Sequence, residues 1–272
     1  MADTPGNDPV LAAMSDIARE AGVLAMTYFA AGSATSARID YKHGGSPVSE
    51  ADLAVDVLLR QRLSPLAPDA AWLSEETADS PERLQRPQLF IVDPIDGTRA
   101  FIKGDPRWSI SIALVESGRP RRAVLHLPAL NETFEAAAGA GATLNGRKLA
   151  TSGRASLAGS RLGGPLAILD ALAANDLGIV RESRVPSLAY RMARVAAGEI
   201  DGGIASADAW DWDVAAADLI VREAGGGFSG LDGQMPLYNA QRPRHGILAA
   251  APAAMHGDLL AALRSAIAKK QP

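Results

Sequence analysis

Residues 89–98 read Leu89-Phe90-Ile91-Val92-Asp93-Pro94-Ile95-Asp96-Gly97-Thr98. The first four residues form a continuous apolar run, which is typical of a strand buried on both faces of a sheet. Two carboxylates follow at the expected carboxyl end of that strand, where ligands bind in open α/β sheets. The proline stiffens the turn, and the glycine permits unusual backbone angles. The stretch predicts a buried strand that ends in an acidic loop.

The two carboxylates of this loop predict a metal site. Asp93 and Asp96 would repel each other unless a cation lay between them. Carboxylate oxygens are hard ligands that suit magnesium. An Asx-type turn, in which both side chains only accept hydrogen bonds from backbone N–H groups, explains the same residues. The loop by itself leaves both interpretations open.

Two further acidic segments favour the metal site. Glu75 and Glu76 follow a short apolar run, and Asp213 stands at the start of an apolar segment, residues 214–224. Taken singly, the glutamates are typical of a solvated turn and Asp213 of a helix N-cap. Together with the acidic loop, the three segments are harder to explain as surface features.

The rest of the chain has the alternating pattern of an α/β protein. A hinge near residues 146–155 is expected to divide it into an N-terminal α+β subdomain, residues 1–150, and a C-terminal α/β subdomain, residues 151–272. Helices are expected at residues 8–30, 49–63, 165–175, 187–197 and 214–224 and from residue 253. Strands are expected at residues 38–42, 89–92, 109–116, 123–127, 133–137, 178–181, 202–205 and 246–250.

Composition excludes several classes of protein and of site. The net charge of −4 does not favour a surface for nucleic-acid polymers or acidic membranes. There are no cysteines, which excludes disulfides and thiolate ligands, and the four histidines are too scattered for a histidine-ligated zinc site. No apolar run is long enough to span a membrane, and the polar segment 1–9 lacks the features of a signal peptide. We therefore expect a cytoplasmic enzyme.

Two of the acidic segments resemble signatures of the inositol monophosphatase superfamily. Residues 93–98, Asp-Pro-Ile-Asp-Gly-Thr, match its first signature. Residues 212–217, Trp-Asp-Val-Ala-Ala-Ala, lead to Glu-Ala-Gly-Gly at 223–226 and match its second. Motifs of this length in the family's order are highly specific.

Two shorter segments extend the resemblance over roughly residues 10–265. Residues 74–76, Ser-Glu-Glu, lie where the family carries its metal-binding glutamate pair. Residues 46–52 look like its Pro-x-Thr-x-x-Asp segment, with Ser49 in place of the usual threonine. The resemblance implies a five-layer αβαβα sandwich, a homodimer, and a phosphomonoesterase that uses two or three Mg²⁺ ions and is inhibited by lithium.

The resemblance also implies roles for individual residues. Glu75, Asp93 and the carbonyl of Ile95 would hold one metal ion, and Asp93, Asp96 and Asp213 would hold a second. The expected catalytic group is Thr98 with Asp52, which would orient the attacking water together with Glu75. The amides of Gly97 and Thr98, together with Arg99, Asp213, Ser206 and Lys42, are the expected substrate or phosphate contacts. Lys42 is equally well explained as a solvated lysine at the end of a strand.

The mechanism agrees with elementary chemistry. An anionic phosphate monoester resists attack by another oxygen, and its leaving alkoxide needs stabilisation. Metal ions lower both barriers, because they activate water for the attack and stabilise the leaving oxygen. A helical turn expected at residues 99–102 would present the amides that precede it to the phosphate.

The substrate is predicted from three local differences. Inositol-specific members usually read Asp-Gly-Thr-Thr-Asn-Phe, whereas residues 96–101 read Asp-Gly-Thr-Arg-Ala-Phe, closer to the Asp-Gly-Thr-Lys-Glu-Phe of 3'(2'),5'-bisphosphate nucleotidases. The glutamate that bonds ring hydroxyls in inositol phosphatases is replaced by Ser206, unless Asp208 or Asp211 takes its role. Candidate contacts for a second phosphate and for a base are Arg99, Lys103, Arg107 and Arg191, and Trp108 and Trp210, although each has an ordinary structural explanation.

We therefore predict a small-molecule phosphatase, first a 3'(2'),5'-bisphosphate nucleotidase. The alternatives are an inositol-1-monophosphatase, which would require Asp208 or Asp211 as the acceptor, and a histidinol-phosphatase, whose members also carry a basic residue after the threonine. A non-catalytic binding protein that uses the phosphatase fold as a scaffold, such as an RNA-polymerase-associated factor, is the alternative from another class.

Overall fold

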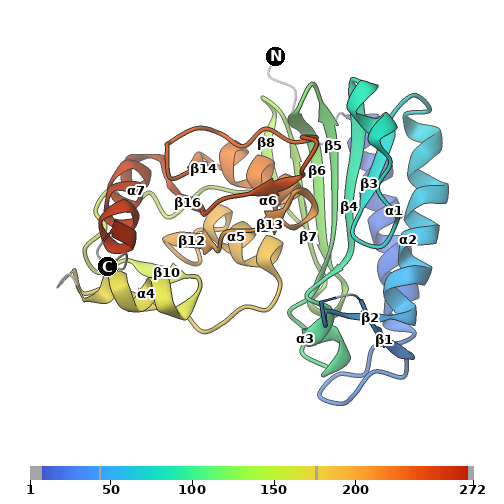
Figure 1. The fold of residues 1–272 in the computed structure, drawn as a ribbon, viewed down its shortest axis with the longest axis horizontal. Helices are drawn as coiled ribbons and strands as arrows, with labels where there is room; N and C mark the ends of the chain where they lie inside the picture. The colour runs from blue at the N-terminus through green and yellow to red at the C-terminus, as the bar shows by residue number, and fades with distance from the viewer. Residues whose placement is uncertain (1–7, 43, 175–176, 269–272) are drawn as a thin grey trace.

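The structure is a computed structural model that describes residues 8–42, 44–174 and 177–268. Its helices and sheets alternate in five layers (Figure 1). One pair of helices covers the outer face of a seven-stranded sheet, a second pair lies between the two sheets, and a third covers the outer face of a five-stranded sheet. The predicted αβαβα architecture is confirmed. Of the polar N-terminal segment, residues 1–7 lie outside the described residues.

The element bounds are as follows. The helices are α1 (Pro9–Met26), α2 (Glu50–Leu63), α3 (Thr98–Ile102), α4 (Leu166–Ala173), α5 (Leu188–Ala196), α6 (Asp211–Glu223) and α7 (Ala253–Ala268), with short 3-10 helices at Ser64–Leu66, Pro81–Gln85 and Pro128–Leu130. The strands are β1 (Ile39–Tyr41), β2 (Pro47–Ser49), β3 (Ala71–Ser74), β4 (Gln88–Asp96), β5 (Ser109–Glu116), β6 (Arg119–Leu127), β7 (Glu132–Ala137), β8 (Gly141–Leu144), β9 (Arg147–Lys148), β10 (Arg161–Gly163), β11 (Val180–Arg181), β12 (Gly202–Ala205), β13 (Ala209–Trp210), β14 (Gly226–Gly230), β15 (Arg244–His245) and β16 (Leu248–Pro252).

The seven-stranded sheet has the order β3-β4-β5-β6-β7-β8-β9, and β4 is the strand that the sequence predicted as buried on both faces. Phe90 and Val92 pack toward α1 and α2, while Leu89 and Ile91 pack toward α5 and α6. The apolar run is continuous because β4 lies between two hydrophobic cores. The strand was predicted to end at Val92, before the carboxylates. It continues instead to Asp96, with a break in register between Asp93 and Asp96.

The first two helices begin where the sequence predicts. Asp8 caps α1 by accepting from the N–H groups of Val10 and Leu11, both at 3.0 Å. Ser49 caps α2 in a capping box with Asp52. The capping box of α2 matters for function, because it fixes the direction of the Asp52 side chain.

The middle layer carries the second half of the site. Helix α6 begins at Asp211 rather than at residue 214, because Trp210 is its N-cap. Asp213 is therefore the third residue of the helix and not its cap. Its Oδ2 accepts from the N–H of Trp210 at 2.7 Å, so the first turn of α6 holds this carboxylate in place.

The five-stranded sheet has the order β11-β10-β12-β16-β14. Strand β14 begins at Gly226, directly after the segment 214–224 that was predicted as a helix, and no strand was predicted there. The strands of the first sheet lie within residues 71–148 and those of the second within 161–252, but one hydrophobic core spans both. The division near residue 150 stays a proposal. In the described part of the chain, no helix is both long and apolar enough to cross a membrane.

Candidate metal centre

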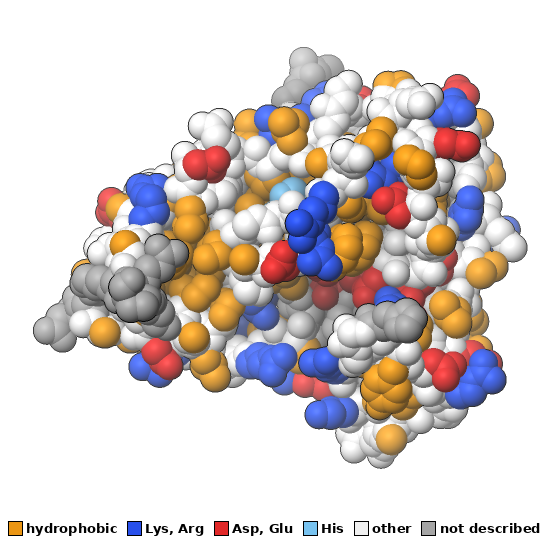
Figure 2. Space-filling model, in the orientation of Figure 1, with side chains coloured by type: hydrophobic (Ala, Val, Ile, Leu, Met, Phe, Trp, Pro, Cys, Tyr) orange, Lys and Arg blue, Asp and Glu red, His pale blue; other side chains and the backbone are white. Residues whose placement is uncertain are grey.

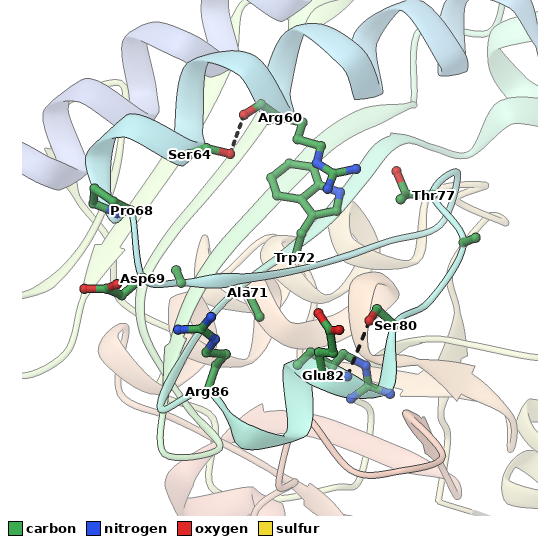
Figure 3. Close-up of a pocket in the computed structure, with 13 residues that line it drawn as sticks. Arg60, Ser64, Pro68, Asp69, Ala71, Trp72, Thr77, Ser80, Glu82 and Arg86 are labelled. Atoms are coloured by element: carbon green, nitrogen blue, oxygen red, sulfur yellow. Dashed lines mark hydrogen bonds between the residues drawn. The ribbon is translucent and has the colours of Figure 1, made fainter.

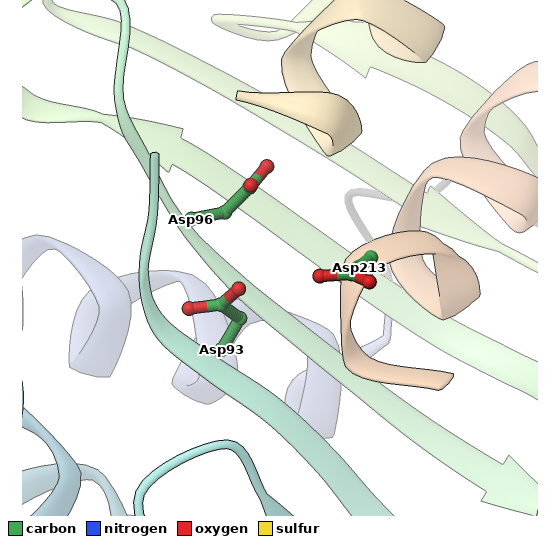
Figure 4. Close-up of side chains that lie close together, drawn as sticks. All are labelled: Asp93, Asp96 and Asp213. Atoms are coloured by element: carbon green, nitrogen blue, oxygen red, sulfur yellow. The ribbon is translucent and has the colours of Figure 1, made fainter. Parts of the chain in front are cut away.

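Three carboxylates from two elements converge between the sheets. Asp93 and Asp96 come from β4 and Asp213 from α6, and one oxygen of each lies within 4.8 Å of the others (Figure 4). Asp93 and Asp96 are only 1% and 6% exposed, and Asp213 is half-buried. The structure thus brings together residues that lie 120 positions apart in the sequence.

The break in β4 aims the first two side chains. Asp93 pairs with Ser111 on β5, Asp96 pairs with Ser109, and the register shifts between them. Oδ1 of Asp93 accepts from the N–H of Ile95 at 3.0 Å. The Asx-type bond that the sequence offered as an alternative is therefore present, but it engages only one oxygen and leaves Oδ2 of Asp93 for another partner.

Helix α5 holds Asp96 from the opposite layer. Oδ2 of Asp96 accepts from the hydroxyl of Ser187 at 2.6 Å and from the N–H of Ala189 at 2.8 Å, and Oδ1 accepts from the N–H of Leu188 at 3.2 Å. These donors belong to the first turn of α5, where N–H groups have no intrahelical acceptor. Ser187 positions Asp96, and no local pattern predicted this contact because the two residues are 91 positions apart.

Repulsion among the three carboxylates favours a bound cation. Burial, with the neighbouring charges of Glu75 and Asp96, raises the pKa of Asp93 well above its usual range. Burial raises the pKa of Asp96 to about 6 in spite of its hydrogen bonds, and burial with the charge of Asp96 raises that of Asp213. Among the described residues, no Lys, Arg or His side chain forms an ion pair with any of the three. An oxygen-binding divalent cation fits this set, because it would relieve the repulsion that these carboxylates otherwise impose.

The glutamate pair lies beside the cluster rather than in it. Nζ of Lys42 lies 2.9 Å from Oε1 of Glu75 and 2.8 Å from Oε1 of Glu76. Burial opposes the lysine's charge, but the two glutamates raise its pKa above the ordinary value. Burial raises the pKa of Glu76 to about 7. Lys42 is therefore not the solvated strand-end lysine that the sequence left open, and it forms ion pairs with both glutamates, including the predicted ligand Glu75.

A hydrogen-bonded chain connects α2 to the end of β4. The hydroxyl of Thr98 lies 3.0 Å from Oδ1 of Asp52 and 3.1 Å from the carbonyl oxygen of Ile95. The other oxygen of Asp52 accepts from the N–H of Ser49 at 2.8 Å and from its hydroxyl at 2.5 Å. Asp52 is buried, and burial raises its pKa. The predicted pair of Thr98 and Asp52 is thus in contact and held on both sides.

Gly97 joins the strand to α3 in a conformation that favours glycine. Its φ is +97°, and a Cβ atom there would lie 3.3 Å from the amide nitrogen of Ser187. The tight turn lets α3 begin at Thr98, directly beside the carboxylates. Arg99, the next residue, is exposed on this turn.

The substrate side of the cleft differs from the sequence-based expectation in two places. Asp211 cannot accept a ring hydroxyl, because Oδ1 lies 2.8 Å from Nε2 of His245 and Oδ2 accepts from the N–H of Asn239 at 2.8 Å. Trp108 cannot contact a base, because it is 0% exposed and packs against Phe101. Asp208 and Ser206 are both exposed, so Asp208 is the remaining acidic candidate near position 206.

Basic side chains flank the hollow between the two halves (Figure 2). Arg191 donates to the carbonyls of Ile204 and Val185 at 3.1 and 3.0 Å, and burial with the like charge of Arg184 lowers its pKa. Both arginines and Ser206 line a cavity of about 330 Å³ near the first turn of α4. Among the described residues neither arginine has a carboxylate ion-pair partner, whereas the predicted contact Arg107 is neutralised by Asp105 at 2.6 Å.

A second hollow lies away from the carboxylates. It measures about 280 Å³ and lies between the end of α2, β3 and the segment that follows β3 (Figure 3). Arg60, Trp72 and Arg86 are among the side chains that line it. It contains none of the predicted site residues, so we treat it as separate from the metal centre.

Comparison with known proteins gives consistent matches. The model of the inositol monophosphatase family matches residues 6–268. A protein named Nus factor SuhB from Xylella fastidiosa is 36% identical over 202 residues, which cover 70% of this chain and 68% of that protein. A histidinol-phosphatase from Mycobacterium tuberculosis is 34% identical over 241 residues, which cover 84% and 88%. The solved structure of a Thermotoga maritima IMPase superposes with a TM-score of 0.80 at 28% identity, over 93% of this chain and 96% of that one.

Proposed function

The chain belongs to the inositol monophosphatase family, whose members are phosphomonoesterases, and from this premise we propose that it is a magnesium-dependent 3'(2'),5'-bisphosphate nucleotidase. The buried cluster of Asp93, Asp96 and Asp213 is the observation that supports a metal-dependent reaction most strongly. The cations and the missing carboxylate on the substrate side support the choice of a bisphosphate.

The cluster would hold the metal ions. Asp93 is the expected shared ligand, with Asp96 and Asp213 on one side and Glu75 and the carbonyl of Ile95 on the other. When bound, Mg²⁺ supplies Lewis-acid stabilisation of charge and activation of water. Two or three ions and inhibition by lithium are part of the proposal, and activity unchanged in millimolar lithium would count against this kind of site.

The chain's own groups position the reactants. Asp52 can accept the hydroxyl proton of Thr98, which leaves a lone pair of the threonine oxygen to hold a water molecule in place. The N–H groups of Gly97 and Thr98 begin a helical turn, where no intrahelical acceptor exists, so they are available to phosphate oxygens. Lys42 would release Glu75 to the metal while it keeps Glu76 neutralised.

The choice among phosphate esters rests on charge. A polyol would lack a carboxylate acceptor at position 206, where this chain has an exposed serine. The ammonium group of histidinol phosphate would meet Arg184 and Arg191 in a cavity whose carboxylate, Glu182, is already paired with Arg161 and Arg194. A second phosphate would instead be attracted by both arginines.

The test is phosphate release in Mg²⁺ from adenosine 3',5'-bisphosphate, its 2',5' isomer, inositol 1-phosphate and histidinol phosphate. We expect kcat/KM for one of the bisphosphates to exceed those for the other two esters by about tenfold, a preference of about 1.4 kcal/mol. A preference for inositol 1-phosphate would reject the bisphosphate assignment and make Asp208 the expected hydroxyl acceptor.

The alternative from another class would give a different result. A scaffold or RNA-polymerase-associated protein would bind a phosphate ester in Mg²⁺ without turnover. The intact ligand set argues against this alternative. A homodimer and a cytoplasmic location remain predictions of the proposal.

A further inference from the structure

A stack of three planar side chains lies at the start of α6. The indole rings of Trp210 and Trp212 have centroids 4.6 Å apart and an interplanar angle of 12°. Cζ of Arg244 lies 3.9 Å from the ring centroid of Trp210. The pairing of β13 with β15 sets Trp210 opposite Arg244, so the backbone fixes the order of the stack.

The stack is joined directly to the metal centre. The backbone N–H of Trp210 donates to Oδ2 of Asp213, and Trp212 precedes Asp213 in the chain. A phosphate held at Asp213 would therefore lie next to the turn that carries these rings. Neither Trp212 nor Arg244 was among the candidates that the sequence suggested.

The outer end of the stack is open. Trp212 packs against the large hydrophobic core, so the inner end is covered. The Arg244 side chain is 32% exposed, and its one ion-pair partner among the described residues is Asp208 at 3.5 Å. The Asp208 side chain is 70% exposed, and an exposed pair of this kind is weak. The guanidinium can therefore exchange this partner for a ligand.

We infer that Arg244, supported by Trp210, is the binding surface for a planar aromatic leaving group, the base of a nucleotide. This inference rests on the proposed function and identifies the part of the substrate that the phosphate site cannot recognise. A guanidinium is planar and stacks on aromatic faces, which an ammonium group cannot do. Trp210 would keep that plane fixed in the orientation that a base requires.

A simpler role for Arg244 is attraction of a second phosphate by charge alone. The two roles predict different effects of replacing Arg244 with lysine. Arg244→Lys keeps the positive charge but loses the plane, whereas Arg244→Ala loses both. Stacking predicts that the two variants are equally impaired, and charge attraction predicts that the lysine variant keeps most of the function.

The experiment compares adenosine 3',5'-bisphosphate with glycerol 2-phosphate, an ester without a ring. For the nucleotide, both variants should raise KM about tenfold and change kcat less than about twofold. For glycerol 2-phosphate, both variants should match the wild type. Arg242→Ala is the matched control, because Arg242 is an exposed arginine on the same segment outside the stack.

Three outcomes would overturn the inference: a lysine variant that behaves as wild type, equal losses on both esters, or no loss on either. A binding measurement keeps the test separate from the proposed function. AMP should quench the tryptophan fluorescence of the wild-type protein and of Arg242→Ala but not that of the two Arg244 variants. If the wild type released no phosphate from either ester, the proposed function would fail. The fluorescence result would still show whether Arg244 on Trp210 binds a nucleotide base.

Discussion

The two walls of the cleft are built in different ways. On the wall formed by β4 and α2, the side chains of Asp93, Asp96 and Asp52 are buried, and backbone or hydroxyl donors hold each carboxylate. On the opposite wall, Ser206 and Arg184 are exposed. Groups that must meet a metal ion and water in one geometry are fixed in advance, whereas some groups assigned to the substrate, such as Ser206 and Arg184, remain exposed. The first wall, called the fixed wall below, therefore accounts for the chemistry. The second, called the open wall, accounts for the choice of ester.

The largest expected effect comes from the fixed wall. Asp93→Asn removes a charge from the centre of the cluster, and we expect kcat/KM to fall at least about 10³-fold, which is about 4 kcal/mol of barrier. The variant should remain folded, because the substitution also removes repulsion among buried carboxylates. Phosphate release and thermal unfolding measure the two effects. Asp16→Asn, at an exposed site on α1, is the control, and activity near wild type in Asp93→Asn would break the comparison.

The seven-stranded sheet that carries this wall should also show a specific sensitivity to acid. Burial lowers the pKa of His126 in β6 from 6.5 to about 4. Because the folded-state pKa lies below the unfolded-state value, the unfolded chain takes up the proton first. The contribution of His126 to the free energy of unfolding should be greatest above pH 6.5 and fall by up to about 3 kcal/mol as the pH decreases toward 4. Denaturant titrations across this range should show the wild type losing stability relative to His126→Gln as the pH falls, and equal slopes in the two proteins would reject the assignment.

The hydroxyl of Thr98 is expected to act on kcat. Thr98→Val keeps the shape of the side chain but removes the group that contacts Asp52, so we expect kcat to fall about 10²-fold with little change in KM. Thr98→Ser is the matched control and should keep most of the activity, since serine restores the hydroxyl. A valine variant with normal kcat would remove Thr98 from the catalytic group.

The smallest effect is expected on the open wall. Ser206→Glu restores the carboxylate that binds ring hydroxyls in the inositol phosphatases, so the ratio of kcat/KM for inositol 1-phosphate to that for adenosine 3',5'-bisphosphate should rise about tenfold. Ser206→Gln has a similar shape without the charge and should change the ratio less. An unchanged ratio in Ser206→Glu would show that position 206 does not face the leaving group.

The sequence predicted the fixed wall much better than the open one. The apolar run before Asp93 and the caps at Asp8 and Ser49 are local signals. The structure contains the strand and the two helix starts that they predict. The start of α6 was wrong by three residues because Trp210, a residue with no capping preference, occupies the cap. Strand β14 was missed because glycines carry no strand signal of their own.

The contacts that complete the site were beyond local reasoning. Ser187 reaches Asp96 across 91 positions, and Lys42 reaches Glu76 across 34. No spacing rule connects such pairs, because the packing of separate layers brings them together. The stack of Arg244 on Trp210 likewise depends on the pairing of β13 with β15.

Removal and restoration of the metal tests whether Asp93, Asp96 and Asp213 form a metal centre. Phosphate release from adenosine 3',5'-bisphosphate would be followed in Mg²⁺, after chelation with EDTA, and after Mg²⁺ is added back in excess. We predict that chelation abolishes turnover, that Mg²⁺ restores it, and that Mg²⁺ raises the melting temperature of the wild type but not that of Asp93→Asn. Turnover that persists through chelation would contradict the assignment of Asp93, Asp96 and Asp213 as the metal centre.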